Sequence, residues 1–204
     1  EMIGCLVGSE MSIRDRYQLE QNKLEQEKTN QKNISSIKNL NLAYHPMYLG
    51  DSNSAKVIYE FVDYNCGYCQ KFHQELINVM KDNSLKLVII QMPILGNFSE
   101  ELTKLALASS LQGQFKVVHN YLYSTERKSK MEDILADLFL KGVDLDILKN
   151  DLESQEVSDF LSIHRSYADE FKFTGTPATI IGNQIIPGFI DADKITEILE
   201  KEFS

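Results

Sequence analysis

The sequence predicts an α/β domain that carries a helical insertion and follows an N-terminal helical segment. Two observations predict the α/β class. The apolar, β-prone stretch "KVIYEFVDY" (56–64) runs into a stretch of helical period (67–82), and the apolar run "LKLVIIQMP" (85–93) has the length of a buried parallel strand. A long block of helical patterns between 99 and 171 predicts the insertion. The chain has 204 residues, 43% of them hydrophobic, which is enough for one substantial core.

Residues 1–41 are the first predicted unit, an N-terminal helical segment and linker. Between Glu10 and Asn33 there are five basic and five acidic residues and neither Gly nor Pro, which indicates a mixed-charge helix. Six positions follow a seven-residue repeat and form a seam along this helix. Three of them are apolar, Ile13, Tyr17 and Leu24, and three are polar, Glu20, Glu27 and Gln31. This apolar face is too small to hold the helix against the main body, so we expect either a solvated tail or an oligomerising stalk. We expect a linker at 33–41 and a loop at 45–54.

Residues 42–98 are the first half of the α/β domain. A strand at 56–64, a crossover helix at 67–82 and a strand at 85–93 make a right-handed βαβ unit. Cys66 lies where the first strand meets the helix. There, the free backbone N–H groups and the positive end of the helix dipole favour a thiolate over a thiol. The junction therefore predicts a reactive sulfur.

The remaining chain divides into the helical insertion, 99–171, and the second half of the α/β domain, 172–204. Helical patterns cover 99–111, 129–142, 144–152 and 158–171. The second of these starts with a capping box, Ser129 and Glu132, and stops at Gly142. The stretch 174–189 predicts two short strands around a Gly-Asn turn, and 191–203 predicts a helix that starts at an Asp cap.

The cysteine count favours redox chemistry over a metal site. Cys66 and Cys69 form one close pair, and the third cysteine, Cys5, is remote. Zinc would need two more soft ligands, but there is no second such pair and the histidines are scattered. His73, four residues past Cys69, is expected to be an ordinary residue on the helix flank. The sequence predicts no metal and no cofactor here.

Charge and hydropathy exclude two other classes. The net charge is −9, whereas phosphate binding needs concentrated Lys and Arg, so we expect no nucleic-acid partner. No apolar run approaches the roughly 20 residues that span a bilayer.

Four stretches carry a family resemblance: "EFVDYNCGYC" (60–69), "PILGNFSEEL" (93–102), "GTPATIIGN" (175–183) and "PGFIDADKI" (187–195). Together they resemble the thioredoxin superfamily, and within it the DsbA-like branch. The resemblance runs from about Ala55 to the C-terminus. It implies a thioredoxin fold, with the helical block as the insertion that distinguishes this branch from thioredoxin itself.

The resemblance also implies roles for site residues. Cys66, at the helix start and more exposed, is expected to attack, and Cys69, one turn further in, to resolve the mixed disulfide. The family places Thr176–Pro177 opposite Cys66 with a cis peptide bond, which leaves the Thr176 backbone free to pair with an extended substrate. The alternative for Pro177 is a turn residue at a strand edge.

Glu60 and the residues between the cysteines receive weaker assignments. Glu60 resembles the buried acid that assists proton transfer in this family, and the alternative is a surface carboxylate on an edge strand. Tyr64 and Tyr68 are candidates for an apolar landing surface for clients, or are simple packing residues. Gly67-Tyr68 resembles the dipeptide of DsbC-type isomerases and of the oligomeric ScsC-type proteins.

These features predict a thiol–disulfide isomerase that works as a homo-oligomer, with a trimer as one candidate number, through residues 9–41. The alternatives are a monomeric DsbA-like dithiol oxidase with a disordered tail and a periplasmic Cu(I)-binding or holdase module. The expected partners are misfolded or unfolded secreted proteins and a membrane protein that resets the dithiol.

The resemblance implies a location in the bacterial periplasm. The first residue is Glu1, and "EMIGCLVG" (1–8) resembles the end of a secretion or lipoprotein signal. Cys5 is then a lipidation site that anchors the protein, an interchain thiol, or a remnant of the signal region.

Overall fold

The computed structural model describes residues 13–39 and 47–204, and it confirms the predicted α/β class. One sheet carries all five strands of the described residues, in the order β1-β3-β2-β4-β5. The strands are β1 (Tyr48–Gly50), β2 (Val57–Val62), β3 (Lys86–Gln91), β4 (Ala178–Ile181) and β5 (Gln184–Pro187). β2 and β3 are parallel, and the other neighbours are antiparallel. The predicted strands at 56–64 and 85–93 thus lie at the centre of the sheet.

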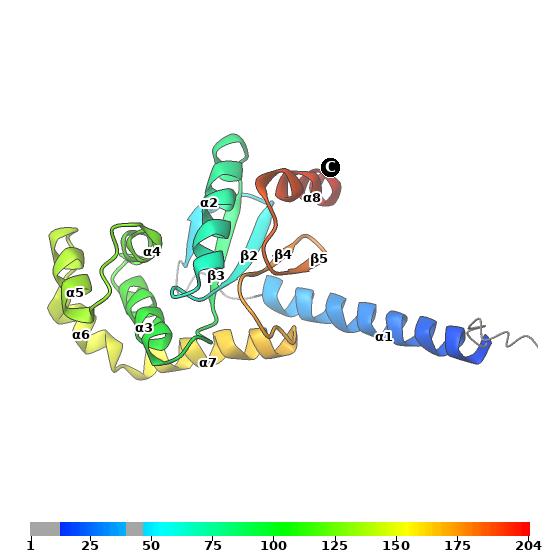
Figure 1. The fold of residues 1–204 in the computed structure, drawn as a ribbon, viewed down its shortest axis with the longest axis horizontal. Coiled ribbons are helices and arrows are strands. Elements are labelled where there is room, and N and C mark those ends of the chain that lie inside the picture. Colours follow the sequence, from blue (N-terminus) through cyan, green and yellow to red (C-terminus); the bar gives the residue numbers. More distant parts are fainter. Residues whose placement is uncertain (1–12, 40–46) are drawn as a thin grey trace, which may run out of the picture.

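Helices cover both faces of the sheet (Figure 1). On one face lie α2 (Gly67–Asp82) and α8 (Ala192–Phe203), and on the other lie α7 (Gln155–Glu170) and the end of α1 (Ile13–Lys38). Because side chains alternate along a strand, β2 serves both faces. Ile58 and Val62 pack towards α2, whereas Tyr59 and Phe61 pack in the second cluster with α7 and α1. Glu60, between Tyr59 and Phe61, therefore faces α2.

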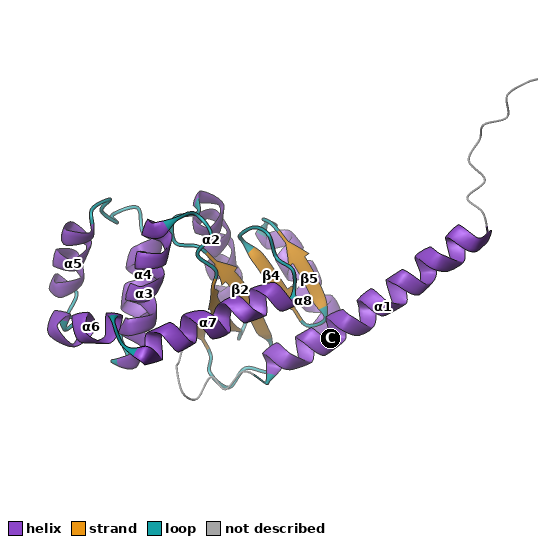
Figure 2. Cartoon of the chain, turned by 90° about the horizontal axis from the view of Figure 1, so that it is seen from below, coloured by secondary structure: helices purple, strands orange, loops and turns teal. Residues whose placement is uncertain are grey.

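Four further helices lie beside the sheet, at the end opposite the free end of α1 (Figure 2). They are α3 (Asn97–Leu111), α4 (Phe115–Tyr123), α5 (Met131–Leu140) and α6 (Leu145–Leu152). Their buried Leu side chains join the core that α2 covers, and each such burial stabilises the fold by about 1.5–3 kcal/mol. The sequence pattern did not predict α4. The predicted capping box is wrong, because α5 starts after Lys130, whose side chain makes no capping bond.

The N-terminal helix differs from its prediction at its C-terminal end. We expected a linker from residue 33, but α1 continues to Lys38. Ile34 and Ile37 are buried in the second cluster, and Asn33 Nδ2 donates a hydrogen bond to the carbonyl oxygen of Glu170 at 2.5 Å. The last turns of α1 are thus docked on the domain, whereas Tyr17 and Leu24 are exposed. Residues 40 and 41 lie outside the described residues.

The predicted loop at 45–54 contains a strand, β1, in its described part. Gly50 ends this strand with φ of 81°, and a Cβ atom there would overlap the carbonyl oxygen of Leu85. The turn out of β1 therefore requires glycine. Among the helices that the structure describes, none is long and apolar enough to cross a membrane.

Candidate active site

The two cysteines lie at the start of α2 with different exposure. Cys66 is the N-cap residue of α2, with extended backbone angles, and is half-buried, whereas Cys69 is fully buried. The backbone N–H of Cys69 donates to the Sγ atom of Cys66 at 3.4 Å. A negative charge on Cys66 would thus meet a backbone donor and the positive end of the helix dipole. Burial raises the pKa of Cys69 well above its ordinary value of 9.0, so its resting form is the thiol.

The hairpin of β4 and β5 brings Thr176 to Cys66. The Sγ atom of Cys66 donates to the carbonyl oxygen of Thr176 at 3.4 Å. The peptide bond between Thr176 and Pro177 is cis, and Pro177 is buried at the entry to β4, which pairs with the central strand. Its carbonyl oxygen accepts a hydrogen bond from the N–H of Gly188 at 2.9 Å. The structure thus places Thr176 and Pro177 beside the cysteines.

Asp63 ties this site to a second loop and was not singled out from the sequence. It is fully buried, and its carbonyl oxygen accepts from the N–H of Cys66 at 3.0 Å. Its carboxylate accepts from the N–H of Asn65 at 2.8 Å, of Ile94 at 2.8 Å and of Leu95 at 3.0 Å. The sequence signal for Asp63 is its place in the first of the four family stretches (60–69). Two of its hydrogen-bond donors, Ile94 and Leu95, lie in the second stretch (93–102).

Exposed apolar side chains lie on α2 and on two segments that contact α2 or the turn before it. Tyr68 in the first turn of α2 is 65% exposed, and Ile94 and Leu95 are held near Cys66 by Asp63. Phe189, after β5, contacts Phe72 of α2 with its ring. We call the exposed members of this surface the apolar rim: Tyr68, Ile94, Leu95 and Phe189.

Gly67 is exposed beside Cys66, and a Cβ atom there would meet nothing within 4 Å. The approach to Cys66 is therefore open on this side. Tyr64, by contrast, is buried, so the expectation that it forms part of a landing surface is wrong. Its hydroxyl lies 2.8 Å from His119 Nδ1 and accepts from Gln91 Nε2 at 3.1 Å.

Glu60 lies on β2, the central strand, and its side chain faces α2. It is therefore not a surface carboxylate on an edge strand. Its side chain is fully buried, and neither carboxylate oxygen has a hydrogen-bond partner. Burial raises the pKa of this carboxyl above its ordinary value of 4.5, and His73 acts in the opposite direction. The Nδ1 atom of His73 lies 3.6 Å from Oε2 of Glu60.

His73 is a second residue whose sequence interpretation was wrong. Instead of lying on the helix flank it is 2% exposed and faces Glu60. Its ring stacks on Tyr123 with centroids 4.9 Å apart, and His119 meets it edge-on at 4.7 Å. The missed signal was helical spacing: Cys66, Cys69 and His73 follow each other at intervals of three and four, which puts them on one face of α2.

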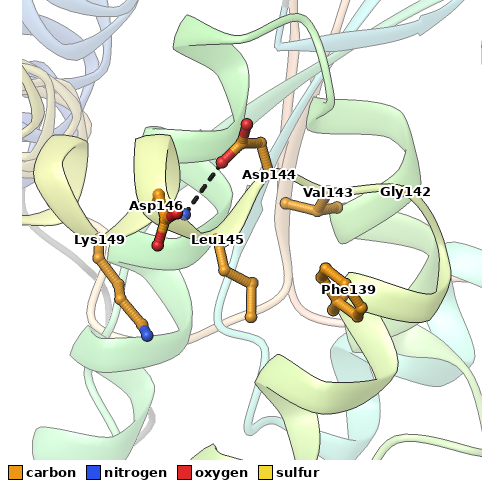
Figure 3. A pocket seen from close by; sticks show the side chains of 7 residues that line it. All are labelled: Phe139, Gly142, Val143, Asp144, Leu145, Asp146 and Lys149. Atoms are coloured by element: carbon orange, nitrogen blue, oxygen red, sulfur yellow. Dashed lines mark hydrogen bonds between the residues drawn. The ribbon is translucent and has the colours of Figure 1, made fainter.

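A separate surface pocket lies where α5 meets α6 (Figure 3). Its lining includes Phe139, Val143, Asp144, Asp146 and Lys149. Asp144 is the N-cap of α6, and its carboxylate accepts from the N–H of Asp146 at 3.0 Å. This pocket holds neither Cys nor His, and the carboxylate of Asp144 is used by the helix cap. The cysteine site is therefore the better candidate for chemistry.

Three comparisons agree with this geometry. The family model described as thioredoxin matches residues 43–201. A probable disulfide bond formation protein D from Bacillus cereus is 24% identical over 169 residues, which are 76% of this chain and 77% of that protein.

Two solved structures share the fold. The thiol–disulfide exchange protein alpha-DsbA2 from Wolbachia pipientis has a TM-score of 0.76 at 24% identity, over 87% of this chain and 97% of that one. A linker-deletion mutant of ScsC from Proteus mirabilis has a TM-score of 0.71 at 19% identity, over 96% of this chain and 98% of that one.

Proposed function

Because this chain belongs to the thioredoxin family and is a thiol–disulfide oxidoreductase of the DsbA-like type, we propose that it is a disulfide isomerase. Its clients would be secreted proteins with non-native disulfides. The observation that carries the proposal is the asymmetry of the cysteine pair. An accessible Cys66 begins α2 and a buried Cys69 follows one turn later.

In this proposal Cys66 attacks a client disulfide as a thiolate, and the client's other sulfur leaves as a thiolate. The mixed disulfide between Cys66 and the client then has two fates. Another client thiolate attacks the client sulfur and releases Cys66, which completes an isomerisation. Alternatively Cys69 attacks Cys66 and releases a reduced client, which leaves the pair oxidised. Glu60 is the proposed acceptor of the Cys69 proton.

Client binding would use the backbone of Thr176 and the apolar rim. An extended client segment can pair with the main-chain groups before Pro177, as a strand added to a sheet edge. Tyr68 offers an aromatic surface next to the sulfur, and Gly67 leaves room for the client backbone. Exposed apolar groups of this kind suit an unfolded client, whose own apolar side chains are accessible.

Two features favour an isomerase over an oxidase. Gly67-Tyr68 provides no imidazole between the cysteines to stabilise the thiolate of Cys66, which favours a less oxidising pair. The second feature is α1, a 26-residue helix whose exposed part carries Tyr17 and Leu24. Such a helix has little stability alone, and packing against other copies would order it. Several Cys66 thiolates would then act on one client at high effective concentration.

The second candidate is a monomeric dithiol oxidase. It is favoured by the relative from Bacillus cereus, which is named for disulfide bond formation rather than isomerisation. For either candidate we propose a location outside the cytoplasm, where disulfides persist, and a membrane protein that resets the redox state of the pair. Cys5 and residues 1–8 lie outside the described residues, so anchoring through Cys5 stays a prediction.

A repair assay tests the proposal. The reduced protein is added at a substoichiometric amount to a client with scrambled disulfides, without metal or added oxidant. An isomerase restores the native client over many turnovers. An oxidase instead forms disulfides in a reduced client when supplied as the oxidised protein, and leaves the scrambled client unrepaired. Fewer than one turnover per Cys66, together with tight Cu(I) binding by Cys66 and Cys69, would favour a binding module over both.

A further inference from the structure

Two titratable side chains, Glu60 of β2 and His73 of α2, are buried side by side in the core. Glu60 is fully buried and His73 is 2% exposed, and their nearest nitrogen and oxygen atoms are 3.6 Å apart. Neither oxygen of Glu60 nor Nδ1 of His73 has a hydrogen-bond partner. Buried polar groups are normally satisfied, and unsatisfied ones often mark a functional site. Here the two unsatisfied groups face each other across the core.

Burial by itself would keep Glu60 protonated, because a lone carboxylate in a low-dielectric interior is very costly. A protonated Glu60 cannot accept a proton. The imidazole of His73, whose Nδ1 atom lies 3.6 Å from Oε2, opposes this effect on the pKa of Glu60. The structure offers Glu60 no other cationic partner among the described ion pairs.

We propose that His73 is the positioning residue that lets the buried Glu60 carboxylate accept and return the proton of Cys69. The inference rests on the proposed function, in which Cys69 must become a thiolate to resolve the mixed disulfide. The thiol of Cys69 transfers its proton to the Glu60 carboxylate, giving a thiolate and a carboxylic acid. The Cys69 thiolate attacks Sγ of Cys66, the Cys66–client bond breaks, and the client sulfur leaves as a thiolate that takes a proton from water.

Other titratable groups face this pair from the neighbouring elements. They are Tyr64 in the turn before α2, Cys69 in the first turn of α2, and His119 and Tyr123 of α4. Glu60 faces α2 from β2, and Cys69 lies in the first turn of that helix, where a negative charge on Glu60 raises the pKa of the thiol. Burial lowers the pKa of His119 well below 6.5, and burial raises the pKa of both tyrosines. These three are neutral near pH 7, and the basic side chain that the described ion pairs place beside Glu60 is His73.

The ring contacts explain how His73 is held. Tyr123 stacks on one side of the imidazole and His119 meets it edge-on. His119 is fixed in turn by the hydroxyl of Tyr64, 2.8 Å from its Nδ1 atom. The imidazole is thus clamped from α4, and Nδ1 points towards Glu60 across 3.6 Å.

The test separates the two cysteine steps in one experiment. The reduced protein is mixed with an aromatic disulfide that releases a coloured thiolate. Attack by Cys66 releases the first equivalent, and attack by Cys69 on the resulting mixed disulfide releases the second. The rate of each phase is measured across pH for the parent, for His73→Gln and for His73→Phe, which keeps the ring stack on Tyr123.

We expect both His73 variants to slow the second phase at least about tenfold near neutral pH and to move its pH midpoint upward, because the lost partner no longer favours ionised Glu60. The rate of the first phase should stay near that of the parent. In a Glu60→Gln background, His73→Gln should have no further effect on the second phase, since both act through one carboxylate. Additive effects, or an unmoved midpoint in either folded variant, would overturn the inference.

A core variant serves as the matched control. Val79 is buried on the same helix, six residues past His73, so Val79→Ala lowers stability and should leave the midpoint unmoved. A midpoint that moves equally in Val79→Ala would assign the effect to stability and overturn the inference. Failure of the first phase in the parent would instead refute the proposed function, so the two failures are distinguishable. Infrared difference spectra of the Glu60 carboxyl report its ionisation directly, and they should show more protonated acid in His73→Gln than in the parent at the same pH.

Discussion

The Sγ atom of Cys66 lies 3.4 Å from the carbonyl oxygen of Thr176, although 110 residues separate them in the chain. The whole helical block, α3 to α7, is inserted between the two. Both belong to segments that adjoin the central strand β2: the turn into α2 continues it, and β4 pairs with it. A client segment that pairs with the Thr176 backbone would therefore bring its sulfur close to Cys66.

The roles of the two cysteines predict opposite trapping behaviour. Cys69→Ser should accumulate mixed disulfides with clients, because the attacking sulfur remains and the resolving one is gone. Cys66→Ser should form none and should lose exchange, because the remaining thiol is buried and its pKa is raised. Non-reducing electrophoresis with mass spectrometry checks both. Trapping by Cys66→Ser alone would reverse the assignment.

The apolar rim predicts a selective effect on protein clients. Leu95→Ser should raise KM for an unfolded protein about threefold to tenfold, since it removes apolar contact worth about 1 kcal/mol. The rate with a small dithiol should not change. Leu140→Ser is the matched control, because Leu140 is 81% exposed at the end of α5, away from the cysteines. Equal effects of the two variants would mean that the rim does not bind clients.

The sequence was most informative where periodicity and motif coincide. The strands at 56–64 and 85–93, the helix at 67–82 and the position of Cys66 at their junction all follow from local pattern and turn chemistry. The family resemblance added Thr176, because no local rule connects residues 110 positions apart.

Three features of the structure were not predicted from the sequence, and each has a physical reason. Helical spacing could have put His73 on the face of Cys66 and Cys69, but only the fold shows that Glu60 lies opposite it. The docked end of α1 was missed because Ile34 and Ile37 form a contact only with the completed sheet. The partners of Asp63 lie 31 and 32 residues away, and such contacts leave no local signal.

Asp63 predicts a large loss of stability on substitution. Asp63→Ala removes the acceptor for three backbone N–H groups, at Asn65, Ile94 and Leu95. Because bonds to a charged acceptor are strong and the site is buried, we expect the free energy of unfolding to fall by about 3 kcal/mol. Asp144→Ala removes an exposed helix cap and should cost about 1 kcal/mol. Urea denaturation of both variants checks the ranking, and equal losses would contradict it.

The raised pKa of Glu60 predicts how stability depends on pH. The unfolded chain ionises Glu60 above about pH 4.5, whereas the folded protein holds the proton to higher pH, so folding becomes less favourable as pH rises. Glu60→Gln cannot ionise. Relative to the parent it should therefore gain stability with rising pH, by at most about 1.4 kcal/mol per pH unit, until the folded-state pKa is passed.

Urea denaturation of the reduced proteins from about pH 4 to about pH 8 measures this gain. Glu101→Gln removes an exposed carboxylate on α3 and should follow the parent at every pH. A stability difference between Glu60→Gln and the parent that does not grow with pH would contradict the raised pKa.

The exposed part of α1 predicts that copies of the chain associate through the seam. Two single substitutions test whether the seam is the contact. Leu24 lies on the predicted seam, whereas Leu19 lies off it, and both are exposed in one copy of the chain. If copies associate through the seam, Leu24→Glu should reduce the native mass to that of a monomer, and Leu19→Glu should not. A truncated form should start at residue 33, because Asn33, Ile34 and Ile37 are docked on the domain. Light scattering measures the native mass of each form.

The most direct test is the rate of repair of a scrambled client at equal Cys66 concentration, with the full chain, Leu24→Glu and residues 33–204. We expect the full chain to repair the client many times faster than the other two forms, because its sites act together on one client. All three should exchange with a small dithiol at the same rate. Equal repair by the full chain and residues 33–204 would contradict the isomerase proposal and favour the monomeric oxidase.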